Sequence, residues 1–357
     1  MIKERHFFPG SNTSKGFHSF FQYILPLKDA KRLFYIKGGP GTGKSYFMKK
    51  IGQTFADKGY SIEYFHCSSD NESLDAVLIK ELGIVLLDGT APHINDPKVP
   101  GALDEIIDFG VCLDEKNLSL SKNDIMNVDN KIKDSFKRAY SYFAAARAVH
   151  DDWSYQNNKA LDRNKLKDLK KKLKDSILET NLEGLGEERH LFATAFTPNG
   201  IISYVNTIYD FCEKIYVLKG GPGTGKTEVL SYLKEEALIN GHNVEVFHDP
   251  LIPERIEHLV LPELSIAILT SNEINKQSFS GIEIDMETLL DKDHITSASH
   301  FIKESQDTFY TLLEQGLKNL VNCKKLHDEI EQFYVDNIDF KCRDHISEGI
   351  MNRLMKY

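Results

Sequence analysis

The stretch that decides the fold is Gly38-Gly39-Pro40-Gly41-Thr42-Gly43-Lys44-Ser45, and it returns as Gly220-Gly221-Pro222-Gly223-Thr224-Gly225-Lys226-Thr227. Both copies match G-x-x-x-x-G-K-[ST], the pattern of the P-loop. In this motif backbone N–H groups surround phosphates, the lysine reaches the β- and γ-phosphates, and the Ser or Thr hydroxyl binds Mg²⁺. These sixteen residues are therefore predicted to bind nucleotide.

The segments around each loop agree with this prediction. A P-loop needs a strand before it and a helix after it. Apolar runs and helical spacing supply both, as strands at 32–36 and 214–218 and helices at 46–57 and 228–240. Lys44 and Lys226 are accordingly candidate catalytic residues, while Ser45 and Thr227 are candidate Mg²⁺ ligands.

The duplication extends over nearly the whole chain of 357 residues. Glu4-Arg5-His6 recurs as Glu188-Arg189-His190, the two P-loop lysines are 182 residues apart, and Asp114 has its equivalent in Asp291. Such self-similarity predicts two repeats of one architecture. We place the first P-loop NTPase repeat at 1–186 and the second at 187–357.

Each repeat is predicted to be an α/β domain with a parallel sheet flanked by helices. A short first strand leads through a polar turn into a helix, and the P-loop unit follows. The next expected strands are 61–66 and 83–87, with a turn-like stretch between them, and 243–248 and 265–269 in the second repeat. Helical spacing then predicts a C-terminal two-helix arm on each repeat, at about 120–180 and 296–357.

Asp88 is the candidate catalytic acid and third candidate Mg²⁺ ligand. It ends the strand 83–87, where P-loop enzymes hold Mg²⁺, whereas Thr270 stands at the equivalent place in the second repeat. This asymmetry predicts a catalytic first site and a binding or regulatory second site. Gly89 occupies the place of a water-polarising Glu, so a base has to come from elsewhere. The candidates are Asp96, Asp104 and Glu105, and His93 in the same loop is either a catalytic group or a solvated residue. The strand-end histidines His66 and His248 are either core residues or γ-phosphate contacts.

Arg5 and Arg189 occupy equivalent positions near the start of the two repeats. They form salt bridges, or they act as arginine fingers between the repeats, and Arg189 is the preferred candidate because it lies at the junction. In the latter case the repeats form an intramolecular pseudo-dimer, which echoes the two-fold preference of homodimers.

Composition is that of an ordinary globular protein. The net charge of −9 argues against a dedicated nucleic-acid binder, although the lysine-rich helix at 161–178 keeps a polyanion partner open. The five cysteines have no C-x-x-C spacing, which predicts neither a disulfide framework nor a zinc site and fits a reducing cytosol. We find no signal peptide or membrane span and expect a cytoplasmic protein without a membrane partner.

The two loops resemble those of AAA+ ATPases and helicases, without the Asp-Glu pair of those proteins. Over its full length the chain resembles a bacterial family of tandem-duplicated P-loop ATP-binding proteins. The resemblance implies ATP binding, and with the motif it predicts an Mg-ATP-binding protein with slow hydrolysis. Two alternatives are a nucleotide or small-molecule kinase with the arms as lids, and an ATP-dependent scaffold without turnover.

Overall fold

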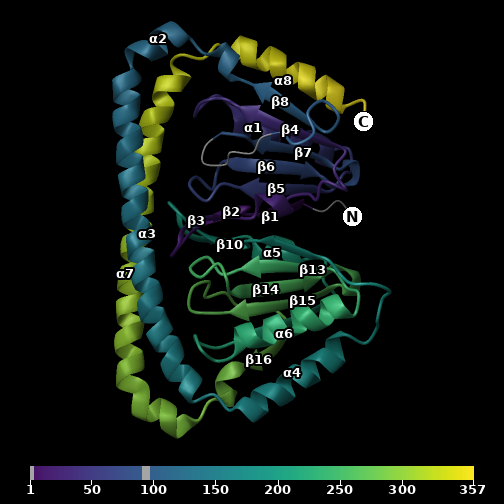
Figure 1. Ribbon diagram of the computed structural model, residues 1–357, viewed down its shortest axis with the longest axis vertical. Helices are drawn as coiled ribbons and strands as arrows, with labels where there is room; N and C mark the ends of the chain where they lie inside the picture. Colours follow the sequence, from purple (N-terminus) through teal and green to yellow (C-terminus); the bar gives the residue numbers. More distant parts are fainter. Residues whose placement is uncertain (1–3, 91–96) are drawn as a thin grey trace.

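Each repeat forms a six-stranded sheet, and the two sheets lie one beyond the other in the computed structural model, which describes residues 4–90 and 97–357 (Figure 1). In spatial order the first sheet contains β1 (Glu4–Phe7), β5 (Ile62–His66), β6 (Leu74–Ile79), β7 (Ile84–Asp88), β4 (Arg32–Lys37) and β8 (Asp104–Asp108). The second contains, in the same order, β9 (Glu188–Leu191), β13 (Val244–His248), β14 (Ile256–Leu261), β15 (Ile266–Ser271), β12 (Lys214–Lys219) and β16 (Ile282–Asp285). The two halves therefore share one topology, as the sequence duplication predicts.

The sheets are mixed rather than parallel. β6 is antiparallel to both of its neighbours and so is β14, while the other neighbouring strands pair in parallel. The prediction of a parallel sheet, with a turn-like stretch in place of β6 and β14, is wrong here. Only residues 80–83 connect β6 to β7, and so short a link joins antiparallel strands.

The polar segment after the first strand of each half forms a hairpin. β2 (Gly10–Thr13) pairs with β3 (Gly16–Ser19), and β10 (Thr194–Thr197) pairs with β11 (Gly200–Ser203). The hydroxyl of Thr13 donates to the carbonyl oxygen of Gly16 at 2.8 Å, so it closes a turn instead of capping a helix. The helices that follow are short, namely η1 (Phe21–Tyr23) and α5 (Val205–Tyr209).

Two helices cover one face of each sheet, and they come from different halves. α1 (Lys44–Ala56) lies on the first sheet together with α8 (Phe340–Leu354), in one apolar cluster that includes Phe47, Ile51 and Leu354. On the second sheet α6 (Lys226–Ile239) is joined by α4 (Arg163–Ile177). The remaining short elements are η2 (Lys80–Leu82), η3 (Gly110–Cys112), α2 (Glu115–Leu120), η4 (Pro262–Leu264) and η5 (Met286–Leu289).

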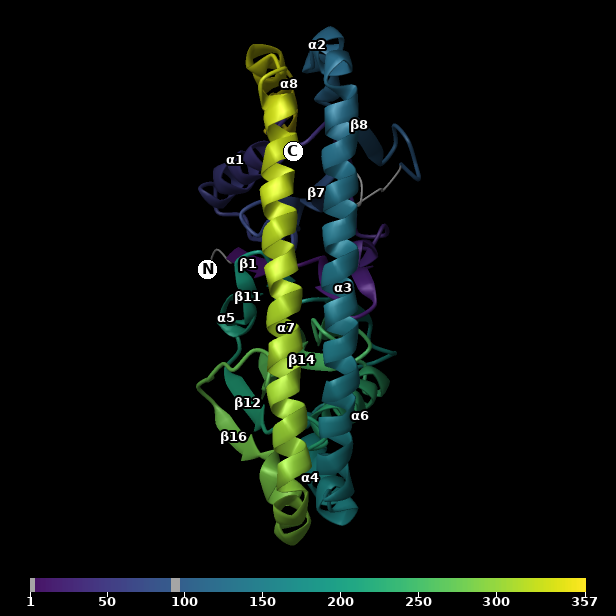
Figure 2. The same ribbon diagram turned by 90° about the vertical axis from the view of Figure 1, so that its left-hand side faces the viewer.

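The long helices of the arms run side by side along both halves. α3 (Lys122–Lys159) and α7 (Lys292–Val335) are antiparallel, as the colours of Figure 2 show. Their contact buries residues at steps of three and four, including Phe143, Phe309 and Leu320, which is the spacing of a coiled coil. Among the described residues, no helix combines the length and apolar composition required to cross a membrane.

The arms are exchanged between the halves. α3 leaves the first half and delivers α4 to the second sheet, while α7 leaves the second half and delivers α8 to the first sheet (Figure 1). The sequence analysis predicts the four arm helices close to their observed bounds, but it does not predict that each arm packs on the opposite half.

The halves also meet directly, at the edge strands β1 and β9. The backbones of Phe8 and Phe192 exchange two hydrogen bonds of 3.0 Å. Beside them four charges form a buried cluster, in which Arg189 is half-buried. Arg5 forms ion pairs with Glu63 and Glu245, and so does Arg189. Two cations and two anions therefore neutralise each other across the junction. Their attraction lowers the pKa of Glu245 to about 2, against the effect of burial, which raises it.

Removing one member of this cluster is expected to destabilise the protein strongly. Arg5→Met leaves Glu245 buried with one partner, which we expect to lower the free energy of unfolding by about 3–5 kcal/mol. The Arg5–Glu245 ion pair contributes its full stabilisation above the pKa of Glu in the unfolded chain, about 4.3. This stabilisation is lost as pH falls toward the folded-state pKa of Glu245, about 2. Denaturant titration checks this. The double variant Arg5→Met/Glu245→Met should regain most of the loss, and a cost below about 1 kcal/mol for Arg5→Met would mean that the cluster behaves as a surface pair.

Candidate functional site

The two glycine-rich loops, residues 38–45 and 220–227, occupy equivalent positions between β4 and α1 and between β12 and α6. Gly43 precedes α1 with a φ of +88°, and Gly225 precedes α6 with a φ of +93°, a backbone conformation that favours glycine. Neither helix has a side-chain cap, whereas α2, α4, α7 and α8 each begin at an aspartate that accepts hydrogen bonds from the first turn. The N–H groups of α1 and α6 thus remain available to an anion.

The structure brings the predicted residues Lys44 and Asp88 together. The Lys44 amine donates to the carbonyl oxygens of Gly38 and Gly39 at 3.0 and 2.9 Å, and it lies 3.7 Å from Oδ2 of Asp88. Oδ1 of Asp88 accepts a hydrogen bond of 2.8 Å from the backbone of Thr90. A lysine and a carboxylate therefore face each other at the carboxyl ends of β4 and β7.

Lys226, the lysine of the second loop, is slightly less exposed than Lys44. Lys226 is 5 % exposed and donates to the carbonyl oxygen of Gly221 at 2.6 Å. Burial lowers its pKa to about 8; the charge of Glu273 opposes this shift and that of Arg255 adds to it. Thr270, at the position of Asp88, is buried, and its backbone N–H donates to Nδ1 of His258 at 3.0 Å. The position of Asp88 is therefore taken by a residue without a carboxylate, although Glu273 lies close enough for its charge to raise the pKa of Lys226.

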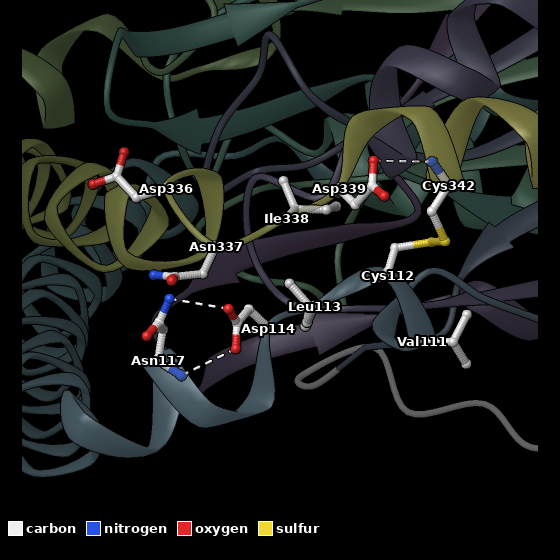
Figure 3. Close-up of a pocket in the computed structure, with 10 residues that line it drawn as sticks. All are labelled: Val111, Cys112, Leu113, Asp114, Asn117, Asp336, Asn337, Ile338, Asp339 and Cys342. Atoms are coloured by element: carbon white, nitrogen blue, oxygen red, sulfur yellow. Dashed lines mark hydrogen bonds between the residues drawn. A yellow bond between two sulfur atoms is a disulfide. The ribbon is translucent and has the colours of Figure 1, made fainter.

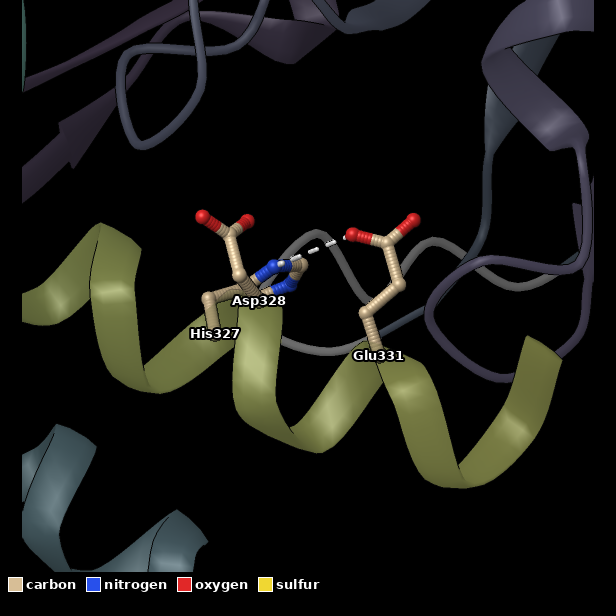
Figure 4. Close-up of side chains that lie close together, drawn as sticks. All are labelled: His327, Asp328 and Glu331. Carbon is tan, nitrogen blue, oxygen red and sulfur yellow. Dashed lines mark ion pairs between the residues drawn. The ribbon is translucent and has the colours of Figure 1, made fainter. Parts of the chain in front are cut away.

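The predicted metal ligands lie at the glycine-rich loops, and the structure shows a further candidate group on another helix. Ser45 and Thr227 lie in the first turns of α1 and α6, and the hydroxyl of Ser45 accepts a hydrogen bond of 3.0 Å from the backbone of Leu74. Sequence reasoning missed a separate group on α7, His327, Asp328 and Glu331, whose ligand atoms lie within 4.8 Å of one another (Figure 4). The i,i+4 spacing of His327 and Glu331 was the available signal. Asp328 also pairs with Lys324, which competes with a metal ion.

Each glycine-rich loop is covered by the arm of the other half, which sequence reasoning also missed. A Cβ built on Gly39 would meet the ring of Tyr334, and one on Gly41 would meet Val335 and Glu331. Over the second loop the corresponding residues come from the first arm. They are Trp153, Ser154, Asn157, Leu161 and Leu166, and Nδ2 of Asn157 donates to the carbonyl oxygen of Pro222 at 2.7 Å.

A disulfide between Cys112 and Cys342 fastens the second arm to the first half, beside a cavity of about 420 Å³ (Figure 3). Backbone hydrogen bonds from Asp114 to Asn337 and from Asp339 to Cys112, of 2.8 and 2.9 Å, hold the same junction. The disulfide overturns the interpretation that the cysteines form no such pair. Its sulfurs come from residues separated by 230 positions, and arm exchange brings them together, so spacing could not indicate it.

The remaining candidate bases are engaged elsewhere or lie outside the described residues. Backbone N–H groups of residues 98 and 99 donate to Asp104, and Glu105 pairs with Arg32 and Arg353. His93 and Asp96 belong to the undescribed residues 91–96.

Of the strand-end histidines, His248 is buried and His66 is half-buried. Nε2 of His66 lies 2.8 Å from Nδ1 of His6, and His248 makes the same contact with His190. Burial is the largest cause lowering their pKa values, to about 4 for His66 and about 3 for His248. His66 ends β5 and His248 ends β13, and two strands separate each of these from the strand that leads into its glycine-rich loop, so neither histidine reaches the loop.

Arg189 does cross between the halves, but it ends at Glu63 and at the carbonyl oxygens of Tyr23 and Ile24. Glu63 lies on β5, and two strands separate β5 from β4, the strand that leads into the first loop, which is roughly 14 Å at the usual spacing. The salt-bridge interpretation therefore holds, and the expectation that Arg189 is an arginine finger is wrong.

The low pKa of Lys226 leads to a test. Its amine is expected to lose its proton as pH rises through about 8. Glu273→Gln should lower this pKa further because it removes a stabilising negative charge, and Arg255→Met should raise it. NMR titration of labelled lysine side chains, with Lys226→Arg to identify the signal, measures both shifts. A midpoint at the ordinary value of about 10.4 would contradict the electrostatics described.

Comparison of the chain with protein-family models, with curated proteins and with solved structures gives no match. The structure itself shows two similar halves, each with a six-stranded mixed sheet flanked by helices. The identity of the glycine-rich loops as P-loops and the resemblance to tandem ATP-binding proteins remain predictions. The function has to be argued from the geometry of the two loops.

Proposed function

We propose that the protein binds Mg-ATP at both glycine-rich loops, acting as P-loops, and hydrolyses it slowly at the first. The observation that carries this proposal is the arrangement of Lys44 and Asp88, 3.7 Å apart at the uncapped N-terminus of α1. In the absence of a phosphate the lysine donates to carbonyl oxygens of its own loop, and these weak contacts can be exchanged for phosphate oxygens.

The residues of the first loop fit the nucleotide in distinct roles. The N–H groups that precede and begin α1 bind phosphate oxygens, and Lys44 neutralises charge on the β- and γ-phosphates. Ser45 and Asp88 would hold Mg²⁺, which would neutralise the negative charge that develops on the outer phosphates. Asp88 also keeps the lysine aimed at the loop before the nucleotide binds. In the second loop Lys226 and Thr227 bind in the same way, but Thr270 cannot replace the carboxylate.

The two halves act as an intramolecular pseudo-dimer in this proposal. Three contacts support it: the β1–β9 junction, the four buried charges and the exchanged arms. Because each arm lies on the loop of the opposite half, nucleotide at one loop is coupled to the position of the other half's helices.

Phosphoryl transfer to a small acceptor is a second candidate. It is favoured by the observation that Asp104 and Glu105, two of the bases proposed for water, are held by other contacts. Arms that cover the loops would then exclude water around an acceptor. Phosphate release measured with and without a panel of metabolites separates hydrolysis from transfer, and unchanged ATP after long incubation would indicate a scaffold.

Both loops are expected to bind nucleotide. Titration calorimetry with Mg-ATP should give a stoichiometry of about two, because each loop keeps its lysine and its uncapped helix. Lys44→Ala and Lys226→Ala should each reduce it to about one. A stoichiometry of one for the unaltered protein would contradict binding at both loops.

Turnover is expected to depend on Asp88. Asp88→Asn should reduce Mg²⁺-dependent phosphate release about 100-fold or more, since the metal carries much of the charge stabilisation, while binding at Lys226 persists. The matched control is Asp108→Asn, which changes an exposed acid at the neighbouring strand end. If Lys226→Ala removes turnover and Asp88→Asn does not, the roles of the loops are reversed.

A further inference from the structure

Arg343 lies directly on the first glycine-rich loop, although it belongs to the arm of the second half. It stands in the first turn of α8, is 9 % exposed, and its Nη1 would collide with a Cβ built on Gly43. The rings of Tyr46 and Phe340 lie 5.9 and 5.1 Å from its guanidinium carbon and limit its movement. The guanidinium is therefore held against Gly43, the residue that precedes α1.

This position is electrostatically unfavourable unless an anion is present. The N-terminus of a helix carries partial positive charge, and Lys44 adds a full one, which Asp88 at 3.7 Å offsets in part. Within the described residues the one acid that pairs with Arg343 is Asp344, 2.8 Å from Nε. That contact lacks hydrogen-bonding geometry, Asp344 is exposed, and Nε has no hydrogen-bond acceptor. A buried cation without a matched partner costs free energy, which an anion at this place would recover.

We propose that Arg343 binds the phosphate groups of the nucleotide held by the first glycine-rich loop, supplied in trans by the arm of the second half. The inference rests on the proposed nucleotide binding at that loop. Arginine suits the role because its planar fork donates two parallel hydrogen bonds to phosphate oxygens. An arginine supplied from outside the nucleotide-binding unit can stabilise phosphoryl transfer.

The second loop has no equivalent cation. Leu166 occupies the position of Arg343 in the first arm, and its methyl groups would meet a Cβ on Gly225. The two arms dock in the same manner. The backbone N–H of Asp162 donates to the carbonyl oxygen of Leu289, and the backbone N–H of Asp339 donates to that of Cys112, both at 2.9 Å. Of these two equivalent arm positions, only the one in the second arm carries a guanidinium, and it lies at the loop that has Asp88.

Calorimetry in a Lys226→Ala background isolates the first loop, with Mg-ATP and Mg-ADP as probes. Arg343→Leu introduces the residue of the second half and should weaken Mg-ATP binding about 10-fold or more, because a charge-assisted phosphate contact is lost. Phosphate release should fall by roughly 10³. Arg353→Leu is the matched control: it removes the same charge from the same helix, but its guanidinium pairs with Glu105 outside the loop. It should leave both measurements unchanged.

Thermal unfolding separates ligand binding from a structural role. Arg343→Leu removes a poorly paired buried charge, so the unliganded variant should melt at the same or a higher temperature, while its stabilisation by Mg-ATP decreases. A lower melting temperature with unchanged Mg-ATP affinity would overturn the inference and assign Arg343 to packing. If Lys226→Ala protein binds no Mg-ATP at all, both the proposed function of the first loop and this inference fail. If it binds and Arg343→Leu binds equally, only the inference fails.

Discussion

The lengths of α3 and α7 constrain the rest of the structure. At 1.5 Å per residue, 38 and 44 residues extend roughly 57 and 66 Å, so a helix that starts beside one sheet ends beside the other. Neither arm can return to the loop of its own half. Because the two helices are antiparallel and pack along their buried stripes, each fixes the register of the other. The first glycine-rich loop is thereby completed by residues about 290 to 300 positions away in the chain, and the second by residues about 60 to 70 positions away.

Duplication supplies two equal frameworks, and the differences between them gather at the loops. Asp88 faces Lys44, whereas Thr270 stands at the matching strand end. Arg343 and Glu331 approach the first loop, whereas Leu166 and Ser154 approach the second. The sheets, the hairpins and the docking of the arms are retained. The Cys112–Cys342 disulfide is a further difference, at one arm junction. Unequal groups at the two loops are what the proposed unequal roles of the two sites require.

The sequence predicts local features well and long-range ones poorly. The loops, the four arm helices and the equivalence of the halves follow from spacing and repetition. The antiparallel pairing of β6 could have been predicted from its apolar run at 74–79. A strand there leaves only residues 80–83 before the next strand, which is too short for a parallel crossover. The position of Arg343 could not, since no local pattern states which loop a distant helix covers. The disulfide of Cys112 with Cys342 could not be predicted for the same reason. Arg189 was the preferred arginine finger because it lies near the junction of the repeats in the sequence.

Charge placement distinguishes the loops from the rest of the molecule. Arg5, Arg189, Glu63 and Glu245 balance one another where the halves meet. Four helices begin at an aspartate that neutralises their positive ends. At α1 the opposite arrangement occurs, because glycine replaces the aspartate, and Lys44 and Arg343 add positive charge to an already positive helix end. Asp88 offsets part of this charge at α1, and Lys226 adds a buried positive charge at the uncapped end of α6. Positive charge therefore gathers at both glycine-rich loops, and this arrangement is what the proposed binding of a multiply charged anion requires.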